Sequence, residues 1–504
     1  MKIRIIILLT VFIGSLPFVA AQRLNKLIYF GYYFDINHPP QILDFRTNPP
    51  SLKKNIGIPA AFRENTASIV DKNDSLLFYS NGCEYLDKNN KIIIPKDSFD
   101  LGLNNDHCGE GLIGNQGFLV LPNADGSSII LYNSIYRILE GTKLWFWKTK
   151  FFVDKISTDL KLERITVLVQ DTLASEPLSA VRDTGEGWWI ITRLFQSNSY
   201  IKYRLVNDTI KSVTKQQIGD LPNSNGSGVG GASFSPDGTK YCLMNANNGV
   251  FVYDFNRKDG TLSNPRRALE DKSIHKFKTY GCSFSPNSRY LYISCANYLY
   301  QLDTQQEDLN ASAVLLDSVL VSDIGTCGFK SVAPNFYVSF LALDCRIYIT
   351  STSGQTCFHV IHNPDYPGKA CNFVKNGFNF YPKHFNGHTL PAFINDMLDR
   401  GNYCDSTILL PVSVDDFVLL DNNKIGVYPN PVGSSLKLTS PSEAGFPSPA
   451  EFCLHDMLGR QVLSSKLQYG TEDIDVSVIT EGLYIWSLSN NGQIYGQGKL
   501  VVER

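Results

Sequence analysis

Three stretches of the chain place chemically active side chains close together in sequence. The run Asp106–Glu110 combines a carboxylate, an imidazole and a thiol, Cys108, which are the groups of a Cys/His nucleophile pair. Such a pair requires adjacency in space, and neighbours in sequence do not supply it. We therefore interpret this run as part of a long Gly-rich loop that carries one disulfide cysteine.

The histidines form two further candidate clusters. His384 and His388 stand four residues apart, but Pro382 and the Asn386-Gly387 turn argue against the helix that would align them for a metal. His359 and His362 lie at the end of an expected strand, where one points inward and the other outward. No Cys-x-x-Cys or zinc-finger spacing is present. The sequence thus predicts no catalytic, cofactor-binding or metal-ligating residue.

Linear enzyme motifs are also missing. The chain has no Gly-x-Ser-x-Gly elbow, Walker loop, EF-hand loop or His-Glu-x-x-His. This weighs against an enzyme without deciding the matter, because propeller enzymes rarely show linear motifs. Tryptophans offer a different chemistry, since exposed rings can stack on sugars. Trp145 and Trp147 share one face of an expected strand, and Trp188-Trp189 opens another, but burial between sheets is the commoner fate of such rings.

The elements that must position these residues are repeated strands. Gly231–Gly238 (Gly-Ala-Ser-Phe-Ser-Pro-Asp-Gly) recurs fifty residues later as Gly281–Ser288 (Gly-Cys-Ser-Phe-Ser-Pro-Asn-Ser), and two more strands follow each copy. The Ser-Pro-Asp-Gly tetrad is turn chemistry, in which Pro presets φ, Asp caps the turn and Gly accepts a positive φ. Each unit therefore reads as strand, tight turn, strand, short loop, strand.

Weaker copies extend this register in both directions. The units begin near residues 67, 118, 180, 232, 282 and 331, the last with Ser331–Asn335 as its first strand and an insertion before Arg346–Thr350. A period of about fifty residues with several short strands predicts an all-β fold, a β-propeller. The strand Leu27–Phe34 and strand-like pieces within 372–395 favour a seventh blade shared between the chain ends. Seven blades are favoured, and six are the alternative.

The last eighty residues carry a second pattern. In order, it contains Val427-Tyr428-Pro429-Asn430-Pro431, the alternating strand Ser434–Leu438, Asp456–Val462, Glu481–Trp486 and Gly498–Glu503. This series resembles the type A C-terminal sorting domain of the type IX secretion system of Bacteroidota. The resemblance implies a small β-sandwich that the secretion machinery recognises as its partner. It implies a secreted or cell-surface location and says nothing of what the cargo does.

The N-terminus is consistent with the same route. Lys2 and Arg4 precede an apolar stretch, Ile5–Leu16, and Val19-Ala20-Ala21 supplies a cleavage site. An uncleaved anchor is the alternative, but the apolar stretch is short for a membrane span. No other stretch approaches the length of a spanning helix. We expect a signal peptide at 1–21, a propeller at 22–400, a linker at 401–423 and the sorting domain at 424–504.

The composition of the chain limits the classes of molecule that it is expected to bind. The formal net charge of −2 over 504 residues offers no electrostatic footprint for nucleic acid or anionic lipid. Aromatic residues make up 12% of the chain and charged residues only 19%, which is typical of strand-rich secreted proteins. Eleven cysteines in an exported chain favour some disulfides. We predict Cys83–Cys108 and Cys282–Cys295, with buried free cysteines as the alternative and at least one thiol left over.

The propeller region has its own resemblance. Ser233–Tyr241 is similar to WD-like and lactonase-like propellers of bacterial surface proteins. Phe30–Cys83, Cys371–Phe373 and Leu390–Ile394 resemble uncharacterised Bacteroidota surface proteins that pair such a propeller with a type IX sorting domain. We expect an exported, non-catalytic module that binds a glycan or a protein and needs no cofactor. The alternative is a hydrolase or lactonase-like enzyme with its site in the central funnel.

Overall fold

The computed structural model divides into two compact units, Met1–Cys404 and Asp405–Arg504. The predicted signal peptide (1–21) and linker (401–423) lie outside the described residues. The residues that the structure describes are 23–503 apart from 25, 32–39, 48–49, 55–56, 63, 72, 100, 102–107, 110, 113–115, 124–125, 141–143, 172–177, 195–196, 222–229, 246–248, 270–279, 328–332, 353–354, 381–389, 392–425, 429–431, 440–449, 457–459, 468–472 and 491–492.

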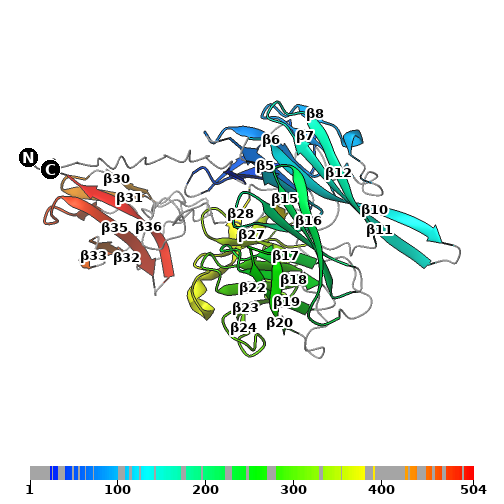
Figure 1. Ribbon diagram of the computed structural model, residues 1–504. Coiled ribbons are helices and arrows are strands. Elements are labelled where there is room, and N and C mark those ends of the chain that lie inside the picture. The colour runs from blue at the N-terminus through cyan, green and yellow to red at the C-terminus, as the bar shows by residue number, and fades with distance from the viewer. Residues whose placement is uncertain are drawn as a thin grey trace, which may run out of the picture. The chain divides into compact units, whose positions relative to one another are not determined.

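Seven β-sheets make up the first unit as described (Figure 1). The first two comprise β2 (Leu27–Phe30), β3 (Gln41–Asp44) and β4 (Ser51–Lys54), then β1 (Arg23–Leu24), β5 (Asn65–Val70), β6 (Leu76–Ser80), β7 (Tyr85–Leu86) and β8 (Ile92–Ile94) with β29 (Leu390–Pro391). The next two comprise β9 (Phe118–Pro122), β10 (Ser128–Glu140), β11 (Leu144–Ile156) and β12 (Leu162–Asp171), then β13 (Ser179–Arg182), β14 (Trp188–Arg193), β15 (Ser199–Val206) and β16 (Thr209–Gln217).

The last three sheets repeat the same up-and-down order of four strands. They comprise β17 (Gly230–Phe234), β18 (Lys240–Asn245), β19 (Gly249–Asn256) and β20 (Thr261–Ala268), then β21 (Gly281–Phe284), β22 (Tyr290–Cys295), β23 (Tyr298–Asp303) and β24 (Val314–Ser318), and finally β25 (Ser339–Leu341), β26 (Ile347–Ile349), β27 (Cys357–Ile361) and β28 (Phe373–Asn379). Among the described residues, short 3₁₀ turns join strands at η1 (Lys96–Ser98), η3 (Val321–Asp323) and η4 (Gly368–Cys371).

Seven hydrophobic clusters show that these sheets form a closed ring. Each cluster contains buried side chains from two sheets. Six clusters join sheets that follow one another along the chain, and the seventh joins the last sheet to the first. Strand β2 makes the closure, because alternate side chains of a strand point to opposite faces. Tyr29 stacks on Tyr79 of the following sheet at 4.0 Å between ring centroids, and Phe30 packs 5.5 Å from Phe358 of the last sheet. The fold is a seven-bladed β-propeller.

The two ends of the propeller meet at β5. Strand β29 contacts β25 and pairs in parallel with β5, placing Leu390 opposite Asn65. Strand β1 pairs antiparallel with β5 as well. A seventh sheet is therefore confirmed, but its strands are not shared between the chain ends as predicted. Its three strands, β2–β4, all come from the N-terminal segment, and β29 joins the sheet of β5 instead.

The repeated turns have the chemistry that the sequence predicts. In the first, the side-chain oxygen of Asp237 accepts the backbone N–H of Thr239 at 3.0 Å, and Gly238 adopts φ +69°. In the second, Asn287 caps in the same way and Ser288 takes the positive φ, +61°. The two turns are also joined to each other, since the Asp237 N–H donates to Ser288 Oγ at 3.1 Å.

One strand prediction is wrong. The first strand of the last four-stranded blade is Ser339–Leu341 and not 331–335, and it pairs directly with β26 without an insertion. The segment before it is tied to the preceding blade instead, because the Phe336 N–H donates to the carbonyl of Ala296 at 2.7 Å. Pro334 also lacks the N–H that a ladder position requires.

The cysteines divide into correct and incorrect predictions. Cys83 and Cys108 form a disulfide with a Cα–Cα distance of 5.7 Å, which confirms the first predicted pair. Cys282 and Cys295 are both free and buried, so the second predicted pair is wrong. The β21–β22 register places Cys282 opposite Ile293, two residues away from Cys295. A disulfide between Cys327 and Cys357, with a Cα–Cα distance of 5.8 Å, was not predicted.

The second unit is a small β-sandwich, as expected. One sheet comprises β30 (Gly426–Tyr428), β31 (Ser435–Thr439) and β34 (Asp473–Asp475), and the other comprises β33 (Gln461–Leu467), β32 (Ala450–His455), β35 (Gly482–Asn490) and β36 (Gln493–Val502). Leu436 and Leu438 of the first sheet pack with Phe452 and Trp486 of the second in one buried cluster. The predicted alternation along Ser434–Leu438 thus marks the inward face.

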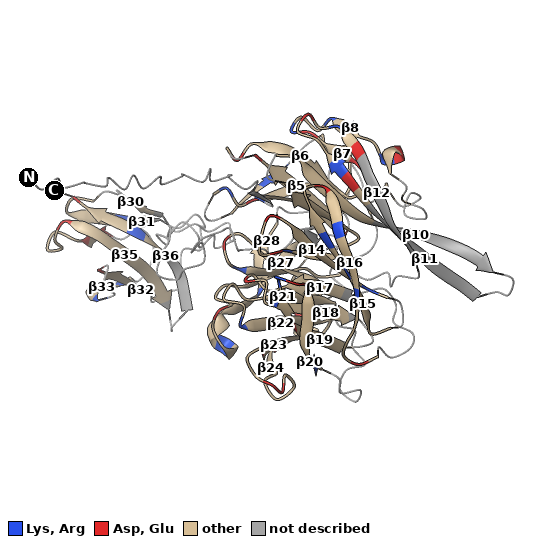
Figure 2. Ribbon diagram, viewed as in Figure 1, with Lys and Arg blue, Asp and Glu red and all other residues tan. Residues whose placement is uncertain are grey.

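Charge and helix content agree with the composition. Lys and Arg residues and Asp and Glu residues are scattered over the described strands and turns in Figure 2, without an extended block of one sign. Among the described residues no helix is both long and apolar enough to cross a membrane.

Candidate functional site

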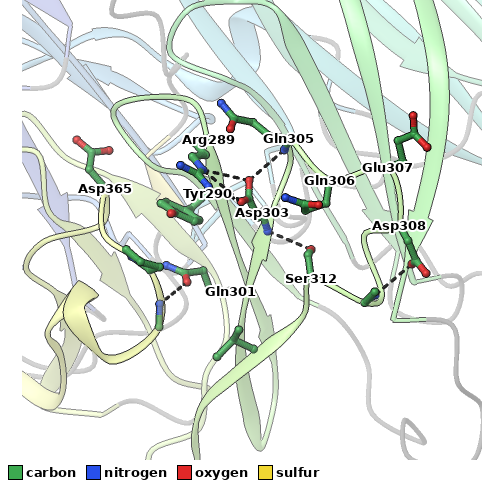
Figure 3. Close-up of a pocket in the computed structure, with 14 residues that line it drawn as sticks. Arg289, Tyr290, Gln301, Asp303, Gln305, Gln306, Glu307, Asp308, Ser312 and Asp365 are labelled. Carbon is green, nitrogen blue, oxygen red and sulfur yellow. Dashed lines mark hydrogen bonds and ion pairs between the residues drawn. The ribbon is translucent and has the colours of Figure 1, made fainter.

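A surface groove of about 930 Å³ lies on the outer part of the blade formed by β21–β24 (Figure 3). The lining residues come from the ends of β22 and β23, the turn that leads into β24, and a turn of the next blade. They are Arg289, Tyr290, Gln301, Asp303, Gln305, Gln306, Glu307, Asp308, Ala311, Ser312, Val314, Asp365, Pro367 and Gly368.

An arginine–aspartate pair forms one wall of the groove. Tyr290 pairs with Asp303 across the β22–β23 ladder, so the preceding residue, Arg289, reaches the Asp303 carboxylate. Three hydrogen bonds join them, from Nε to Oδ1 and to Oδ2, both at 3.2 Å, and from Nη2 to Oδ2 at 2.8 Å. The guanidinium also lies 5.0 Å from the centroid of the Tyr290 ring. The pair fixes both side chains, as Figure 3 shows.

A buried amide ties the floor of the groove to the neighbouring blade. Gln301 is 2% exposed, and its Nε2 donates to the Tyr292 hydroxyl at 2.7 Å and to the Tyr366 carbonyl at 2.8 Å. Its Oε1 accepts the Gly368 N–H at 2.7 Å. Because all three bonds are buried or partly buried, the groove has a rigid floor that bridges two blades.

The groove is acidic. It contains four carboxylates, those of Asp303, Glu307, Asp308 and Asp365, against the single guanidinium of Arg289. Partial burial by itself would raise the pKa of Asp303, but hydrogen bonds from Arg289 and the Gln305 N–H outweigh it and lower that pKa. Burial raises the pKa of Asp365, opposed by the Asn287 N–H that donates to it at 2.8 Å. Such a groove favours cationic or hydrogen-bonding ligands over anions.

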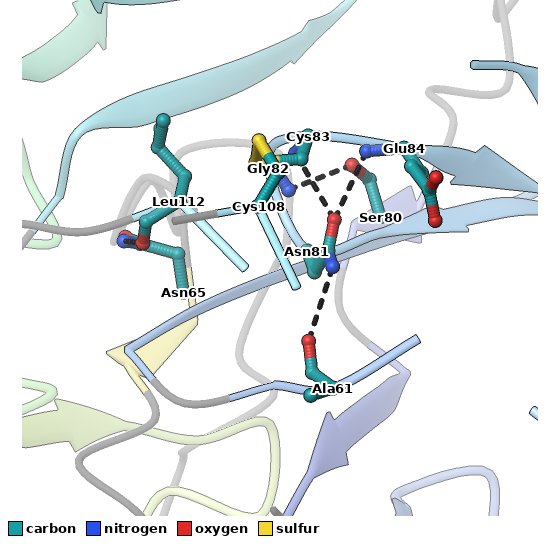
Figure 4. The surroundings of a disulfide bond; sticks show 9 residues. All are labelled: Ala61, Asn65, Ser80, Asn81, Gly82, Cys83, Glu84, Cys108 and Leu112. Atoms are coloured by element: carbon teal, nitrogen blue, oxygen red, sulfur yellow. Dashed lines mark hydrogen bonds between the residues drawn. A yellow bond between two sulfur atoms is a disulfide. The ribbon is translucent and has the colours of Figure 1, made fainter. Parts of the chain in front are cut away.

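The run Asp106–Glu110 does not provide a nucleophile. Cys108 is bonded to Cys83, and Asp106, His107 and Glu110 lie outside the described residues. Around the disulfide, Asn81 Oδ1 accepts the N–H groups of Cys83 and Glu84, each at 3.0 Å (Figure 4). The interpretation as a disulfide loop is therefore confirmed for Cys108, because its sulfur is not a free thiol.

The histidines that the structure describes are not arranged for catalysis. His359 is fully buried, its Nδ1 accepts the Asn376 N–H at 3.1 Å, and its Nε2 lies 3.2 Å from Ser351 Oγ. Burial lowers the pKa of His359 to about 4, and burial together with Arg346 lowers that of His362 to about 4. Both rings are therefore neutral near pH 7. His384 and His388 lie outside the described residues.

No group of three or more potential metal ligands gathers anywhere in the described part of the chain. The strands nearest the propeller axis also carry few groups that could act in catalysis. The described residues of β5, β9, β13, β17, β21 and β25 include neither a carboxylate nor a histidine. Small hydroxyls interact there instead, with Ser283 Oγ and Ser339 Oγ 3.0 Å apart.

An amide side chain also joins three blades near the axis. Gln116, just before β9, accepts the Leu178 N–H with its backbone carbonyl at 3.1 Å. Its side chain forms two bonds of 2.8 Å with the backbone of Ala232 in β17, two blades away.

The tryptophans that the structure describes are structural. Trp188 and Trp189 are each 2% exposed, and Trp189 Nε1 donates to the Arg257 carbonyl at 2.8 Å. The side chains of Trp145 and Trp147 lie outside the described residues. Buried packing, and not sugar stacking, thus accounts for the Trp188-Trp189 pair.

Sequence reasoning missed the groove. Its lining comes from segments far apart in the chain, 289–314 and 365–368, which only the packing of adjacent blades brings together. The polar run from Asp303 to Asp308 between two strands was the one local signal, and it reads as an ordinary turn.

The second unit decides the export question, because its strands, core and residue landmarks coincide with one known module. Residues 426–503 match the secretion system C-terminal sorting domain. This domain directs type IX secretion, so the protein is secreted or attached to the cell surface. The match to this domain confirms the predicted partnership with the secretion machinery.

Several solved structures are similar to this chain at low sequence identity. PorZ, described as an essential bacterial surface component of the type IX secretion system of Porphyromonas gingivalis, is 9% identical, with 97% of this chain and 76% of that chain covered and a TM-score of 0.33. A Lactobacillus plantarum protein is 11% identical, with 73% and 98% covered and a TM-score of 0.42.

A putative 6-phosphogluconolactonase from Bacteroides uniformis is 12% identical, with 66% of this chain and 90% of that chain covered and a TM-score of 0.39. No curated protein matches the chain. Because all three TM-scores are low, the propeller assignment rests on the sheet order and the ring of hydrophobic clusters.

Proposed function

We propose that this exported propeller is a non-catalytic module that binds a glycan or a protein, and that the acidic groove beside β24 is its binding site. The observation that carries the proposal is the groove itself, which is preformed, polar and supported by a buried amide on its floor. Binding sites are typically concave and largely preformed, with a few fixed polar groups.

The fixed pair in the groove favours binding over catalysis. Asp303 is held by three bonds from Arg289, and its lowered pKa keeps it ionised. A general acid near pH 7 needs the opposite shift, as burial away from a cation would give. The lining residues also include no histidine and no thiol. These features support recognition, with Arg289 and Asp303 as fixed hydrogen-bonding groups.

The domain division belongs to the same proposal. We assign a cleaved signal peptide to 1–21, the binding propeller to 22–400, a linker to 401–423 and the sorting domain to 424–504. In this scheme the first segment supports passage through the inner membrane, and the last directs passage through the outer one.

The test is a binding screen on the full-length secreted chain with two probe classes, neutral oligosaccharides such as laminarihexaose and cellohexaose, and short synthetic peptides. The groove variant combines Gln305→Ala with Glu307→Gln, both at exposed positions. We expect at least one probe to bind and the groove variant to weaken that binding about tenfold. A matched variant, Glu186→Gln in an exposed turn of another blade, should bind like the natural chain.

Two outcomes would contradict the proposal. Equal binding by the natural chain and the groove variant would place the site elsewhere. Turnover of a bound oligosaccharide, with products that appear in proportion to the protein, would show an enzyme.

A further inference from the structure

Exposed apolar side chains concentrate on one sector of the propeller. Half of the large hydrophobic residues that are exposed in the described chain lie between residues 314 and 374. Five of them follow one another along β24 and the loop after it, namely Val314, Leu315, Leu320, Val321 and Ile324. We call these five the β24 surface. Val321 is 85% exposed and Leu320 is 55% exposed, so this is not ordinary partial exposure of core residues.

The strand beneath this surface differs in composition from the other outer strands. β24 is the outermost strand of its sheet and reads Val-Leu-Leu-Asp-Ser. The corresponding strand β16 carries Lys211 and Lys215, and β20 carries Pro265 and two arginines. Lysine and proline are the residues by which edge strands avoid pairing with another chain. β24 has neither, although a β-bulge interrupts its pairing with β23, and η4 and the Lys375 side chain contact it. The part of the strand that is most exposed is its beginning, Val314 and Leu315.

The loop that presents the apolar side chains is held in place. Lys375 Nζ donates to Asp323 Oδ2 at 2.8 Å and to the Ser318 carbonyl at 2.9 Å. The disulfide Cys327–Cys357 then anchors the far end of the loop to β27. These bonds keep the loop from folding Leu320 and Val321 back onto the blade. A surface ordered in advance loses less entropy when a partner binds.

The acidic groove lies at the opposite end of β24 from the apolar loop. Val314, the first residue of β24, is part of the groove lining together with Glu307 and Asp308. The five residues of β24 span about 17 Å, since a strand rises about 3.3 Å per residue. An acidic groove and an apolar loop thus lie along one exposed edge, within the reach of a single extended segment.

We propose that the β24 surface and the adjoining groove bind an extended polypeptide segment that carries basic residues at the groove and apolar residues at the loop. This inference rests on the proposed binding function and names its ligand class. The carboxylates supply complementarity for Lys or Arg, and the edge of β24 accepts backbone hydrogen bonds by strand addition.

Other ligands fit this surface less well. The five side chains of the β24 surface are aliphatic, whereas sugar rings stack on flat aromatic faces. One exposed ring does stand beside the groove, that of Tyr366, which is 50% exposed between the lining residues Asp365 and Pro367. The Tyr290 ring, which lines the groove, is 5% exposed and has the Arg289 guanidinium against it. An anionic lipid surface would be repelled by the groove carboxylates. The combination therefore favours a basic, apolar polypeptide over a glycan or a membrane.

The test uses the full-length chain and a fluorescein-labelled peptide of ten residues that alternates Lys with Val or Leu. Its matched control alternates Glu with the same apolar residues. We expect saturable binding of the Lys peptide by fluorescence polarisation, and binding of the Glu peptide weaker by about tenfold or more.

Matched variants locate the binding. The double variant Val321→Ser with Ile324→Ser removes apolar area at exposed positions and should weaken the Lys peptide about tenfold. Val213→Ser, at a 57% exposed position of β16, is its control and should change binding less than twofold, or about 0.4 kcal/mol. Glu307→Lys should weaken binding about fivefold or more. Glu186→Lys alters the net charge equally and should have little effect.

Four results would overturn the inference. Equal binding of the Lys and Glu peptides would exclude charge recognition, and equal binding by the Val321/Ile324 variant would place the site elsewhere. Binding of a neutral oligosaccharide that Glu307→Lys weakens, with no peptide binding, would leave the groove as a site but refute the polypeptide ligand. A dimer in light scattering that the Val321/Ile324 variant abolishes, again with no peptide binding, would assign the surface to self-association.

Discussion

Two disulfides between described residues of the propeller, Cys327–Cys357 and Cys83–Cys108, provide a quantitative comparison within one chain. Cys327 and Cys357 are 30 residues apart, and Cys83 and Cys108 are 25 residues apart. Loop-closure entropy for these separations predicts stabilisation of about 3.7 and 3.5 kcal/mol at 25 °C. The two pairs should therefore stabilise the fold almost equally, although only the first holds the loop at Val321.

The perturbation is replacement of each pair by alanine, Cys327→Ala with Cys357→Ala, or Cys83→Ala with Cys108→Ala. All four positions are buried, between 0% and 6% exposed, so the loss of side-chain contacts is similar in both variants. Urea unfolding, followed by the fluorescence of the buried Trp188 and Trp189, measures the free energy of unfolding. We expect each variant to lose about 3–4 kcal/mol.

Limited proteolysis separates the two roles. Chymotrypsin cleaves beside residues such as Leu320, and the loop should become susceptible only when the Cys327–Cys357 bond is absent. A loss below about 1 kcal/mol in either variant would refute the loop-entropy argument. Equal cleavage at the loop in both variants would show that this disulfide does not order it.

Three further predictions concern the core. His359 has a pKa of about 4 in the fold against 6.5 ordinarily, so the unfolded chain binds the extra proton between these values. The free energy of unfolding should then fall by about 3 kcal/mol from pH 6.5 to pH 4, a slope that His359→Gln flattens in urea titrations. Gln116→Ala removes two bonds of 2.8 Å between blades and should cost about 1–3 kcal/mol in the same assay, whereas a loss near zero would show that the bridge is dispensable. Gly260→Ala would place a Cβ 2.7 Å from a tryptophan ring, whereas Gly368→Ala meets nothing within 4 Å. Both have positive φ, so the first should lower thermal stability clearly more than the second, and equal losses would contradict the packing argument.

Features built from local chemistry could be predicted from the sequence. The Ser-Pro turns at Ser235 and Ser285 encode their own hydrogen bonds, and the period between them encodes the repeat. The alternation at Leu436 and Leu438 similarly marks the buried face of the sorting domain. In each case neighbours in the chain are also neighbours in the structure.

Features that depend on register or on contacts between blades could not be predicted in this way. A two-residue offset separates Cys282 from Cys295, and no local signal reports that offset. Cys327 reaches Cys357 because the chain after β24 crosses to the next blade. The groove likewise forms where Asp365 meets the end of β23. The order of residues in the sequence carries little information about such contacts between blades.

The packing of β2 against the last blade, which closes the ring, sets the order in which parts of this protein fold. Ile28 and Phe30 of β2 are buried against Phe340 and Phe358, which follow more than three hundred residues later. Ring closure is therefore among the slowest events of folding, because its contacts span most of the propeller. A chain that ends early would leave these residues exposed to proteases and chaperones. Closure of the ring therefore depends on chain length. Only a chain synthesised almost as far as its sorting domain can bury the apolar side chains of β2.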